Sequence, residues 1–202
     1  MIRIKESELI LNPDGSIYHL NLKPEDISDT ILFVGDQDRV EKITKHFDTI
    51  EFSTQKREFK TQTGTYKGKR ISVISTGIGP DNIDIVLNEL DALINIDFTT
   101  RTIKEKLNSL NIIRIGTSGS LQSDIPVDSF LIGTHGLDLN GMLHFYKLKD
   151  ICNHEIENAF MNHTHWNSNK ARPIFINNSL ELERIFESKQ TYKGITGTAG
   201  GF

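Results

Sequence analysis

Apolar and polar positions follow one another in short blocks that predict strands leading into helices. Residues 31–34 are an apolar run typical of a buried strand. Val40, Ile43 and Phe47 follow at helical spacing, and an aspartate in the intervening turn can cap that helix. This block predicts a strand, a glycine turn and an amphipathic helix.

The next block predicts a β-hairpin. Residues 57–66 and 70–75 carry strand-like patterns on either side of the turn Lys67-Gly68-Lys69. The second arm ends in another glycine turn, Gly77-Ile78-Gly79-Pro80, and a helix is expected to begin near Asp81 with its apolar positions facing inward.

The second half of the chain repeats the alternation less clearly. Residues 95–109 are charged and predict a solvated surface helix. Strands are expected at 111–115 and near 129–134, and helices are expected over 154–167 and after a capping Ser179.

Strands alternating with helices predict an α/β fold, a three-layer sandwich in which helices flank a central mixed β-sheet. The 202 residues suit a single domain over 1–202 with one sizeable core. The net charge of −4, without basic clusters, argues against nucleic acid as a partner. No apolar run approaches the ~20 residues that span a bilayer, so we expect no membrane partner and a cytoplasmic protein. The lone Cys152 has no motif around it and is expected to be a buried or incidental thiol, not a nucleophile, in a reducing compartment.

Two glycine turns carry the candidate chemistry. The strand-turn segments 31–39 and 111–120 each combine an apolar strand, a small-residue turn and an arginine, Arg39 in the first and Arg114 in the second. Open α/β sheets bind ligands just beyond the carboxyl ends of their strands. Backbone N–H groups and guanidinium groups at such a turn suit an oxyanion, for which Arg57 is a third candidate.

The geometry expected of these turns favours phosphate or sulfate. Gly35 lets an oxyanion approach the backbone, and Arg114 shares a strand face with Gly116. Thr117 and Ser118 add hydroxyl donors. The alternative is structural: Arg39 pairs with a neighbouring acid on its helix, and Arg114 pairs with a buried acid. Neither turn has the signature of a P-loop or of a dinucleotide site. The histidines between positions 135 and 165 show no metal-ligand spacing, and a structural zinc there is a lesser alternative.

The ordered motifs Gly35-Asp36-x-Asp38-Arg39, Arg57-Glu58-Phe59, Ser75-Thr76-Gly77-Ile78-Gly79 and Arg114-x-Gly116-Thr117-Ser118-Gly119 resemble the nucleoside phosphorylase family. This family includes uridine phosphorylase and hexameric purine nucleoside phosphorylase. Tyr18-His19-Leu20 fits as well, and the likeness runs from about residue 18 to residue 202.

The resemblance implies an enzyme, a pentosyltransferase of nucleoside catabolism and pyrimidine salvage that needs no cofactor and uses phosphate as co-substrate. It places phosphate with catalytic Arg114 and Thr117, with Gly35 and Arg39, and with Arg57 from a neighbouring subunit. It implies that the nucleoside is held by the following residues: His19 from the neighbour, Thr117, Ser118, Gly119 and Phe202. A shared site requires a dimer at least, and the family suggests a trimer of dimers.

The resemblance also suggests a potassium ion between subunits at Glu58, Ile78 and Asn82, where Asn82 replaces the family's usual serine. We expect uridine as the preferred nucleoside, because Ser75-Thr76-Gly77-Ile78-Gly79 and Leu143-His144-Phe145 look more like uridine phosphorylase, although Thr63-Gly64-Thr65-Tyr66-Lys67-Gly68 also resembles purine-specific relatives. The family's base-selecting residues would follow Phe202, so we expect a C-terminally incomplete chain. A purine nucleoside phosphorylase, a nucleosidase that uses water, and a non-catalytic fragment that binds phosphate or sugar phosphate stay open as alternatives.

Overall fold

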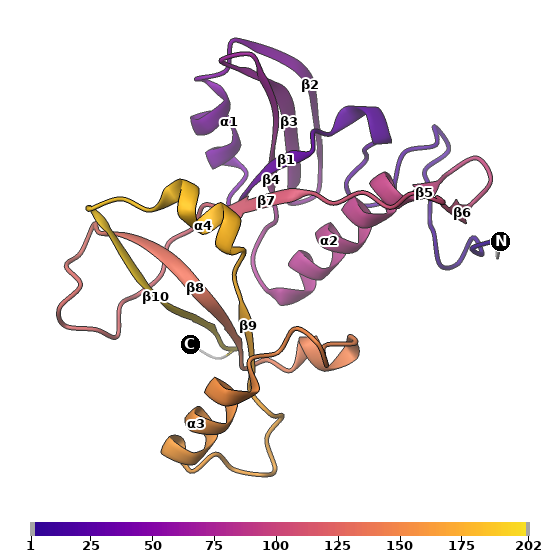
Figure 1. Cartoon of the computed structure of the whole chain (residues 1–202). Coiled ribbons are helices and arrows are strands. Elements are labelled where there is room, and N and C mark those ends of the chain that lie inside the picture. Colours follow the sequence, from indigo (N-terminus) through magenta and orange to yellow (C-terminus); the bar gives the residue numbers. More distant parts are fainter. Residues whose placement is uncertain (1–2, 201–202) are drawn as a thin grey trace. The chain divides into compact units, whose positions relative to one another are not determined.

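The computed structural model describes residues 3–200, and these fall into two compact units, residues 1–117 and 118–202 (Figure 1). The prediction of one domain over 1–202 stays a prediction. The elements of the first unit are, in chain order, a 3-10 helix Pro24–Asp26, β1 Thr30–Val34, α1 Asp38–Thr44, β2 Thr49–Lys56, β3 Phe59–Tyr66, β4 Lys69–Ser75, α2 Pro80–Asn95, β5 Ile96–Asp97, β6 Thr102–Ile103 and β7 Asn111–Arg114.

The first unit is built on a mixed five-stranded sheet of order β2-β3-β4-β1-β7. The β2-β3 and β3-β4 pairs are antiparallel, whereas β1 runs parallel to both β4 and β7. This confirms the α/β class and the central mixed sheet. The predicted hairpin is also confirmed, since Tyr66 pairs with Lys69 across the tight turn.

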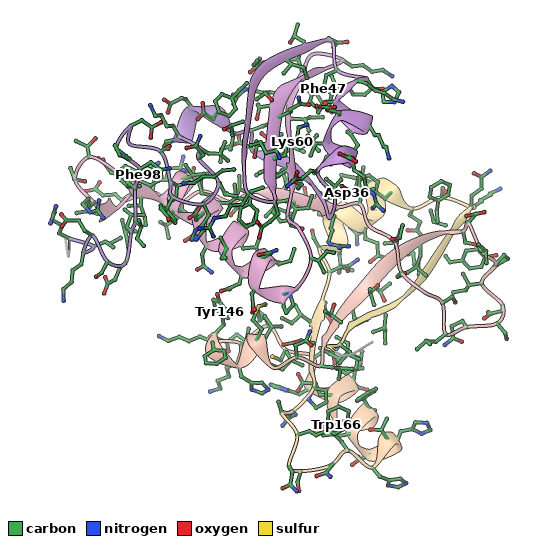
Figure 2. All side chains as sticks on the ribbon, turned by 180° about the vertical axis from the view of Figure 1, so that it is seen from behind. Asp36, Phe47, Lys60, Phe98, Tyr146 and Trp166 are labelled. Carbon is green, nitrogen blue, oxygen red and sulfur yellow. The ribbon has the colours of Figure 1, made fainter. Side chains whose placement is uncertain are left out.

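The alternation of side chains in β1 explains why helices cover both faces of this sheet. Ile31 and Phe33 belong to a buried cluster with Leu90 and Leu93 of α2. The alternate positions, Leu32 and Val34, pack with Val40 of α1, and the ring of Phe47 packs against that second cluster (Figure 2). Successive strand residues face opposite sides of a sheet, so β1 supports both helices.

The predicted surface helix over 95–109 is wrong. Helix α2 ends at Asn95, and the segment forms the short antiparallel pair β5-β6 instead. Arg101 lies in the turn at φ +57° and is 9% exposed. Its guanidinium donates hydrogen bonds to the carbonyl oxygens of Ile4, Lys5 and Leu9. The Arg101 side chain therefore holds the N-terminal segment against the first unit and does not face solvent on a helix surface.

The second unit contains a three-stranded sheet of order β10-β8-β9 with two α-helices. Its elements are β8 Phe130–Asp138, a 3-10 helix Met142–Phe145, α3 His154–Thr164, β9 Ile174–Asn177, α4 Leu180–Phe186 and β10 Thr191–Thr198. The predicted cap of α4 is confirmed, because the Ser179 hydroxyl accepts a hydrogen bond from the Leu182 amide. The helix expected over 154–167 is confirmed as α3 and ends at Thr164.

A buried carboxylate organises the second unit. The Glu157 side chain is 1% exposed and accepts hydrogen bonds from His154 Nδ1 at 2.8 Å, Arg172 Nη2 at 2.9 Å and the Phe175 amide at 3.2 Å. Burial by itself would raise the pKa of Glu157, but these hydrogen bonds, that of His154 first, hold the pKa below its ordinary value. The carboxylate therefore stays ionised and ties α3 to β9.

No helix among residues 3–200 is both long enough and apolar enough to cross a bilayer.

Candidate functional site

Three parallel strand ends meet at one edge of the first sheet. The Thr76 amide, just after β4, donates to the Val34 carbonyl of β1 at 2.8 Å. The Ile115 amide, just after β7, donates to the Phe33 carbonyl at 2.8 Å. The turns that follow β4, β1 and β7 therefore leave the sheet side by side, which is where an open α/β sheet binds ligands.

Two of the glycine turns at this edge are in close contact. A Cβ placed on Gly35 would lie 3.8 Å from the Gly77 carbonyl oxygen. Gly77 has φ +70°, and a Cβ there would approach Asn82 Nδ2 to 2.7 Å and Glu58 Cγ to 2.8 Å. A side chain at Gly77 would be both strained and crowded, so this turn requires glycine.

Arg114 folds its side chain back onto the third turn. A Cβ built on Gly116 would lie 2.1 Å from Arg114 Nη1 and 3.1 Å from its Cζ. This confirms that Arg114 shares a side with Gly116. Gly116 has no side chain to exclude the guanidinium, which therefore lies against the backbone of the turn at the sheet edge.

The other two arginines flank the turn after β1. Arg39 lies in the first turn of α1 and is half-buried, and Arg57 lies in the β2-β3 turn at φ +55°. The Arg57 carbonyl accepts a hydrogen bond from Gln37 Nε2 at 2.7 Å, which joins the β2-β3 turn to the β1-α1 turn. Gln37 in turn accepts a hydrogen bond from Gln55 Nε2 at 2.8 Å.

Within residues 3–200, the guanidinium groups of Arg39, Arg57 and Arg114 form no ion pair with a carboxylate. The acid neighbours of Arg39 are engaged elsewhere. Glu41 pairs with Lys60 at 2.6 Å, and the Asp36 carboxylate accepts the Asp38 amide at 3.0 Å. Arg39 and Arg114 lie next to the turns after β1 and β7, so their guanidinium groups can accept an oxyanion there, and Arg57 offers a third guanidinium from the β2-β3 turn.

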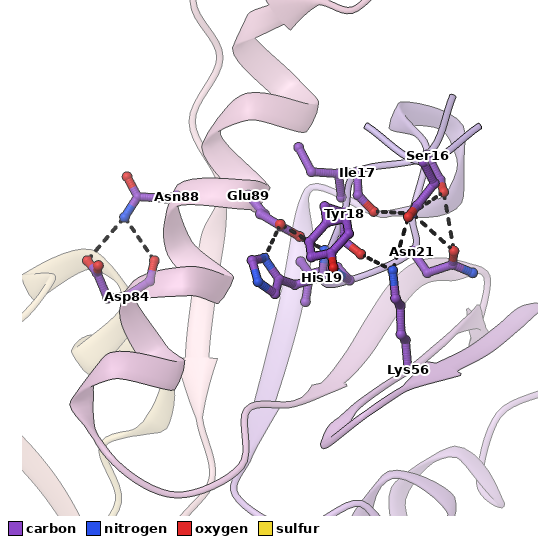
Figure 3. Close-up of polar contacts among 11 residues, drawn as sticks. Ser16, Ile17, Tyr18, His19, Asn21, Lys56, Asp84, Asn88 and Glu89 are labelled. Atoms are coloured by element: carbon purple, nitrogen blue, oxygen red, sulfur yellow. Dashed lines mark hydrogen bonds and ion pairs between the residues drawn. The ribbon is translucent and has the colours of Figure 1, made fainter. Parts of the chain in front are cut away.

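His19, in the N-terminal loop, is held by a carboxylate of helix α2 (Figure 3). Glu89, on α2, accepts a hydrogen bond from His19 Nδ1 at 2.7 Å, from the His19 amide at 2.9 Å and from the Leu20 amide at 2.8 Å. Lys56 of β2 supports the same segment, with Nζ 4.2 Å from the centre of the Tyr18 ring and donating to the Tyr18 carbonyl.

Comparison with known proteins identifies the family. The sequence model of a family described as the phosphorylase superfamily matches residues 29–202. The chain belongs to the phosphorylase superfamily. A uridine phosphorylase of Haemophilus influenzae is 29% identical over 190 residues, which are 91% of this chain and 68% of that protein. A DeoD-type purine nucleoside phosphorylase of Clostridium novyi is 35% identical over 134 residues, 61% of this chain and 52% of that protein.

A solved structure shows the same fold over nearly the whole chain. A Trypanosoma brucei nucleoside phosphorylase, described as showing uridine phosphorylase activity, superposes with a TM-score of 0.83 at 28% identity and covers 96% of this chain and 69% of that one. A uridine phosphorylase of Thermococcus kodakarensis is 35% identical over 128 residues. These residues are 63% of this chain and 41% of that protein. The chain is thus shorter than these relatives.

The nucleoside-binding roles of Thr117, Ser118, Gly119 and Phe202 stay predictions. Thr117 is exposed and closes the first unit, whereas Ser118 and Gly119 open the second. Phe202 lies outside the described residues. The contacts expected of Ser118, Gly119 and Phe202 with a nucleoside therefore stay expectations.

The residues suggested for potassium do lie together. Asn82 Nδ2 donates to the Ile78 carbonyl at 3.1 Å, and both Glu58 and Asn82 border the space beside Gly77. A carboxylate, a carbonyl and a side-chain amide are oxygen donors of the kind that hard cations prefer. The donor set fits, and the site stays a prediction. In the described part of the chain, no group of three His, Cys, Asp or Glu side chains could hold a metal ion.

Glu89 is the residue that the sequence did not point to. It lies on an amphipathic helix in a sequence context typical of a solvated position, yet its side chain is 12% exposed. Its contact with His19 spans 70 positions of the chain, so no local motif announces it.

Proposed function

We propose that this member of the phosphorylase superfamily catalyses phosphorolysis of a nucleoside, with uridine preferred, giving the free base and ribose 1-phosphate. The observation that carries the proposal is that Arg39, just after β1, and Arg114, at the end of β7, have guanidinium groups that form no ion pair within residues 3–200. The relatives named uridine phosphorylase support the choice of substrate.

In the proposed reaction, Gly35, Arg39, Arg114 and Thr117 hold phosphate, and the partner subunit's Arg57 completes its shell. Phosphate attacks C1′ as the glycosidic bond breaks, the ribose becomes cationic in the transition state, and the bonding electrons leave with the base. No covalent nucleophile is needed. The arginines contribute by orienting phosphate and by fixing negative charge beside the developing cation.

The proposal is tested by following base release from uridine and from inosine with and without phosphate. We expect release from uridine that depends on phosphate. Replacing Arg114 by alanine should cost about 2–4 kcal/mol of transition-state stabilisation, as for other preorganised donors. The matched control is Arg184→Ala, which removes an exposed guanidinium of α4 and should leave the rate unchanged. Near-normal phosphorolysis in Arg114→Ala would refute the site assignment.

A purine substrate is the second candidate, favoured by the DeoD-type relatives at 35–37% identity. Faster phosphate-dependent release from inosine than from uridine would establish it. Base release at the same rate with and without phosphate would identify a nucleosidase. Phosphate binding without any release would identify a phosphate-binding fragment, because the chain spans only part of its relatives' length.

The remaining assignments belong to the same proposal. We propose a cytoplasmic homo-oligomer, a dimer at least and in full a trimer of dimers, because the partner subunit's His19 and Arg57 complete each site. A fully active monomer in size-exclusion chromatography would contradict the shared site. We also propose potassium at Glu58, Ile78 and Asn82, and replacing potassium by a bulky organic cation should then lower thermal stability or activity.

A further inference from the structure

The carboxylate of Glu89 on α2 contacts His19 and Leu20 of the Tyr18-His19-Leu20 segment, which lie 70 and 69 positions earlier in the chain. One oxygen, Oε1, accepts from both the His19 amide at 2.9 Å and the His19 ring nitrogen Nδ1 at 2.7 Å. The other oxygen, Oε2, accepts from both backbone amides, that of Leu20 at 2.8 Å and that of His19 at 3.1 Å. Two backbone donors and one ring donor thus converge on a single side chain that is 12% exposed (Figure 3).

This arrangement decides which ring nitrogen of His19 carries a proton. An ionised carboxylate can only accept hydrogen bonds, so Nδ1 must be the donor. In the neutral ring, Nε2 then carries a lone pair. Nε2 has no hydrogen-bond partner among residues 3–200, and the side chain is 26% exposed, so this acceptor is available to a ligand.

The ring is also fixed in orientation. His19 meets the Tyr18 ring edge-on at 4.8 Å between centroids and the Phe59 ring at 6.5 Å. Phe59 is 1% exposed and belongs to the buried core. With Nδ1 held by Glu89 and the ring packed between aromatic neighbours, Nε2 points in one direction only.

We propose that Glu89 is a positioning residue, which holds His19 in the Nδ1–H form so that Nε2 accepts a hydrogen bond from a hydroxyl of the nucleoside. The identity of that hydroxyl, the ribose 5′-OH, rests on the proposed function; the state of the ring does not. A purely structural Glu89 would hold the backbone of His19 and Leu20 and leave the choice of ring tautomer without consequence.

The substitution that separates these roles is Glu89→Gln. Glutamine keeps the length and one accepting oxygen but replaces the other oxygen by an NH2 donor. If the oxygen stays on the backbone amides, the NH2 group faces Nδ1, which must then accept, and the proton moves to Nε2. Asp91→Asn on the same helix is the control, since it removes an exposed charge that accepts a hydrogen bond from Asn95 and does not contact His19.

The first readout needs no activity. In the full chain with 15N-labelled histidine at about pH 8, where an ordinary imidazole is neutral, two-bond 1H–15N spectra report which ring nitrogen is protonated. His19→Ala assigns the His19 signals. We expect an unprotonated Nε2 in the wild type and in Asp91→Asn, and a protonated Nε2 in Glu89→Gln. A His19 ring whose signals do not change in Glu89→Gln would overturn the inference.

The second readout is kinetic and compares uridine with 5′-deoxyuridine, which lacks the hydroxyl. We expect Glu89→Gln to lower kcat/KM about tenfold for uridine and less than about twofold for 5′-deoxyuridine. The double variant His19→Ala/Glu89→Gln should be no slower than His19→Ala, because Glu89 acts through His19. An equal loss on both nucleosides would show a merely structural role and overturn the inference.

The inference can still be tested if the wild type is inactive or if Glu89→Gln does not fold. If the wild type releases no base from any nucleoside, the proposed function fails, and the spectra still decide the state of the ring. If Glu89→Gln does not fold, Glu89→Asp retains the charge but shortens the side chain by one methylene. The inference then requires a selective loss on uridine, and an unselective one contradicts it.

Discussion

Replacing Arg101 by methionine tests the claim that this charge holds the N-terminal segment in place. Methionine keeps an unbranched apolar side chain of similar length and removes every donor. The carbonyl oxygens of Ile4, Lys5 and Leu9 would lose the hydrogen bonds that Arg101 now donates to them. Only Leu9 is buried, at 4% exposed, so only its carbonyl cannot turn to water.

The magnitude follows from that difference. Leaving the Leu9 carbonyl unpaired costs about 1–3 kcal/mol, and each of the other two hydrogen bonds contributes about 0.5–1 kcal/mol net. The sum is roughly 2–5 kcal/mol. Methionine avoids the desolvation cost of a buried guanidinium, which offsets part of this. We therefore expect the lower half of the range, about 2–3 kcal/mol.

Urea unfolding followed by circular dichroism measures the loss, and amide hydrogen exchange locates it. The amides of Ile4 and Leu9, which bond to the carbonyls of Arg101 and Lys5, should exchange faster in Arg101→Met. Lys106→Met, an exposed position of the same segment, is the control. A free energy of unfolding within about 0.5 kcal/mol of the control would refute the reasoning, since that is the range of ordinary surface substitutions.

Three further outcomes are expected. Leu90→Ala, at a position 1% exposed between α2 and the sheet, should lower the free energy of unfolding by about 2–5 kcal/mol in urea. The pKa of Glu157 lies below its ordinary value of 4.5, so its contribution to stability is complete above pH 4.5 and is lost as the pH falls through the lower pKa of the folded state. Glu157→Gln should therefore lose less stability than the wild type between about pH 5 and pH 3. An unchanged dependence of the unfolding free energy on pH would contradict this. Burial, and next the charge of Glu157, raise the pKa of the Cys152 thiol, so iodoacetamide should alkylate it more slowly than free cysteine at about pH 8, and Glu157→Gln should speed the reaction.

Local patterns were sufficient wherever an element is specified by its own residues. The Tyr66–Lys69 turn and the apolar run of β1 were both predicted because turn chemistry and β-branched content lie within a few positions. Strand β2, Thr49–Lys56, was not predicted. It lies at the edge of the sheet with a largely exposed polar pattern, and its pairing with β3 supplies the order that its own side chains do not.

The error over 95–109 has a different cause. Charged residues at helical spacing normally face solvent, and the pattern contains no sign that Arg101 turns inward. Its acceptors lie 92 to 97 positions away, at the start of the chain. The left-handed φ of +57° is unfavourable for a residue with a Cβ, and the three hydrogen bonds compensate for it. A long-range contact therefore overrode the local preference for helix.

The candidate site divides along the same line. Gly35, Arg39 and Arg114 could be proposed from the sequence because strand, turn and arginine are adjacent there, and a parallel sheet brings such turns to one edge. Glu89 could not be found, because what makes it important is the convergence of donors from a loop 69 and 70 positions away. In α2, Leu90 and Leu93 face the core, and position 89 therefore lies beside the N-terminal loop. An apolar side chain at position 89 would leave the amides of His19 and Leu20 and the ring nitrogen Nδ1 of His19 without this acceptor. A carboxylate at that one position satisfies all three, which is why a side chain that reads as solvent-facing is almost buried.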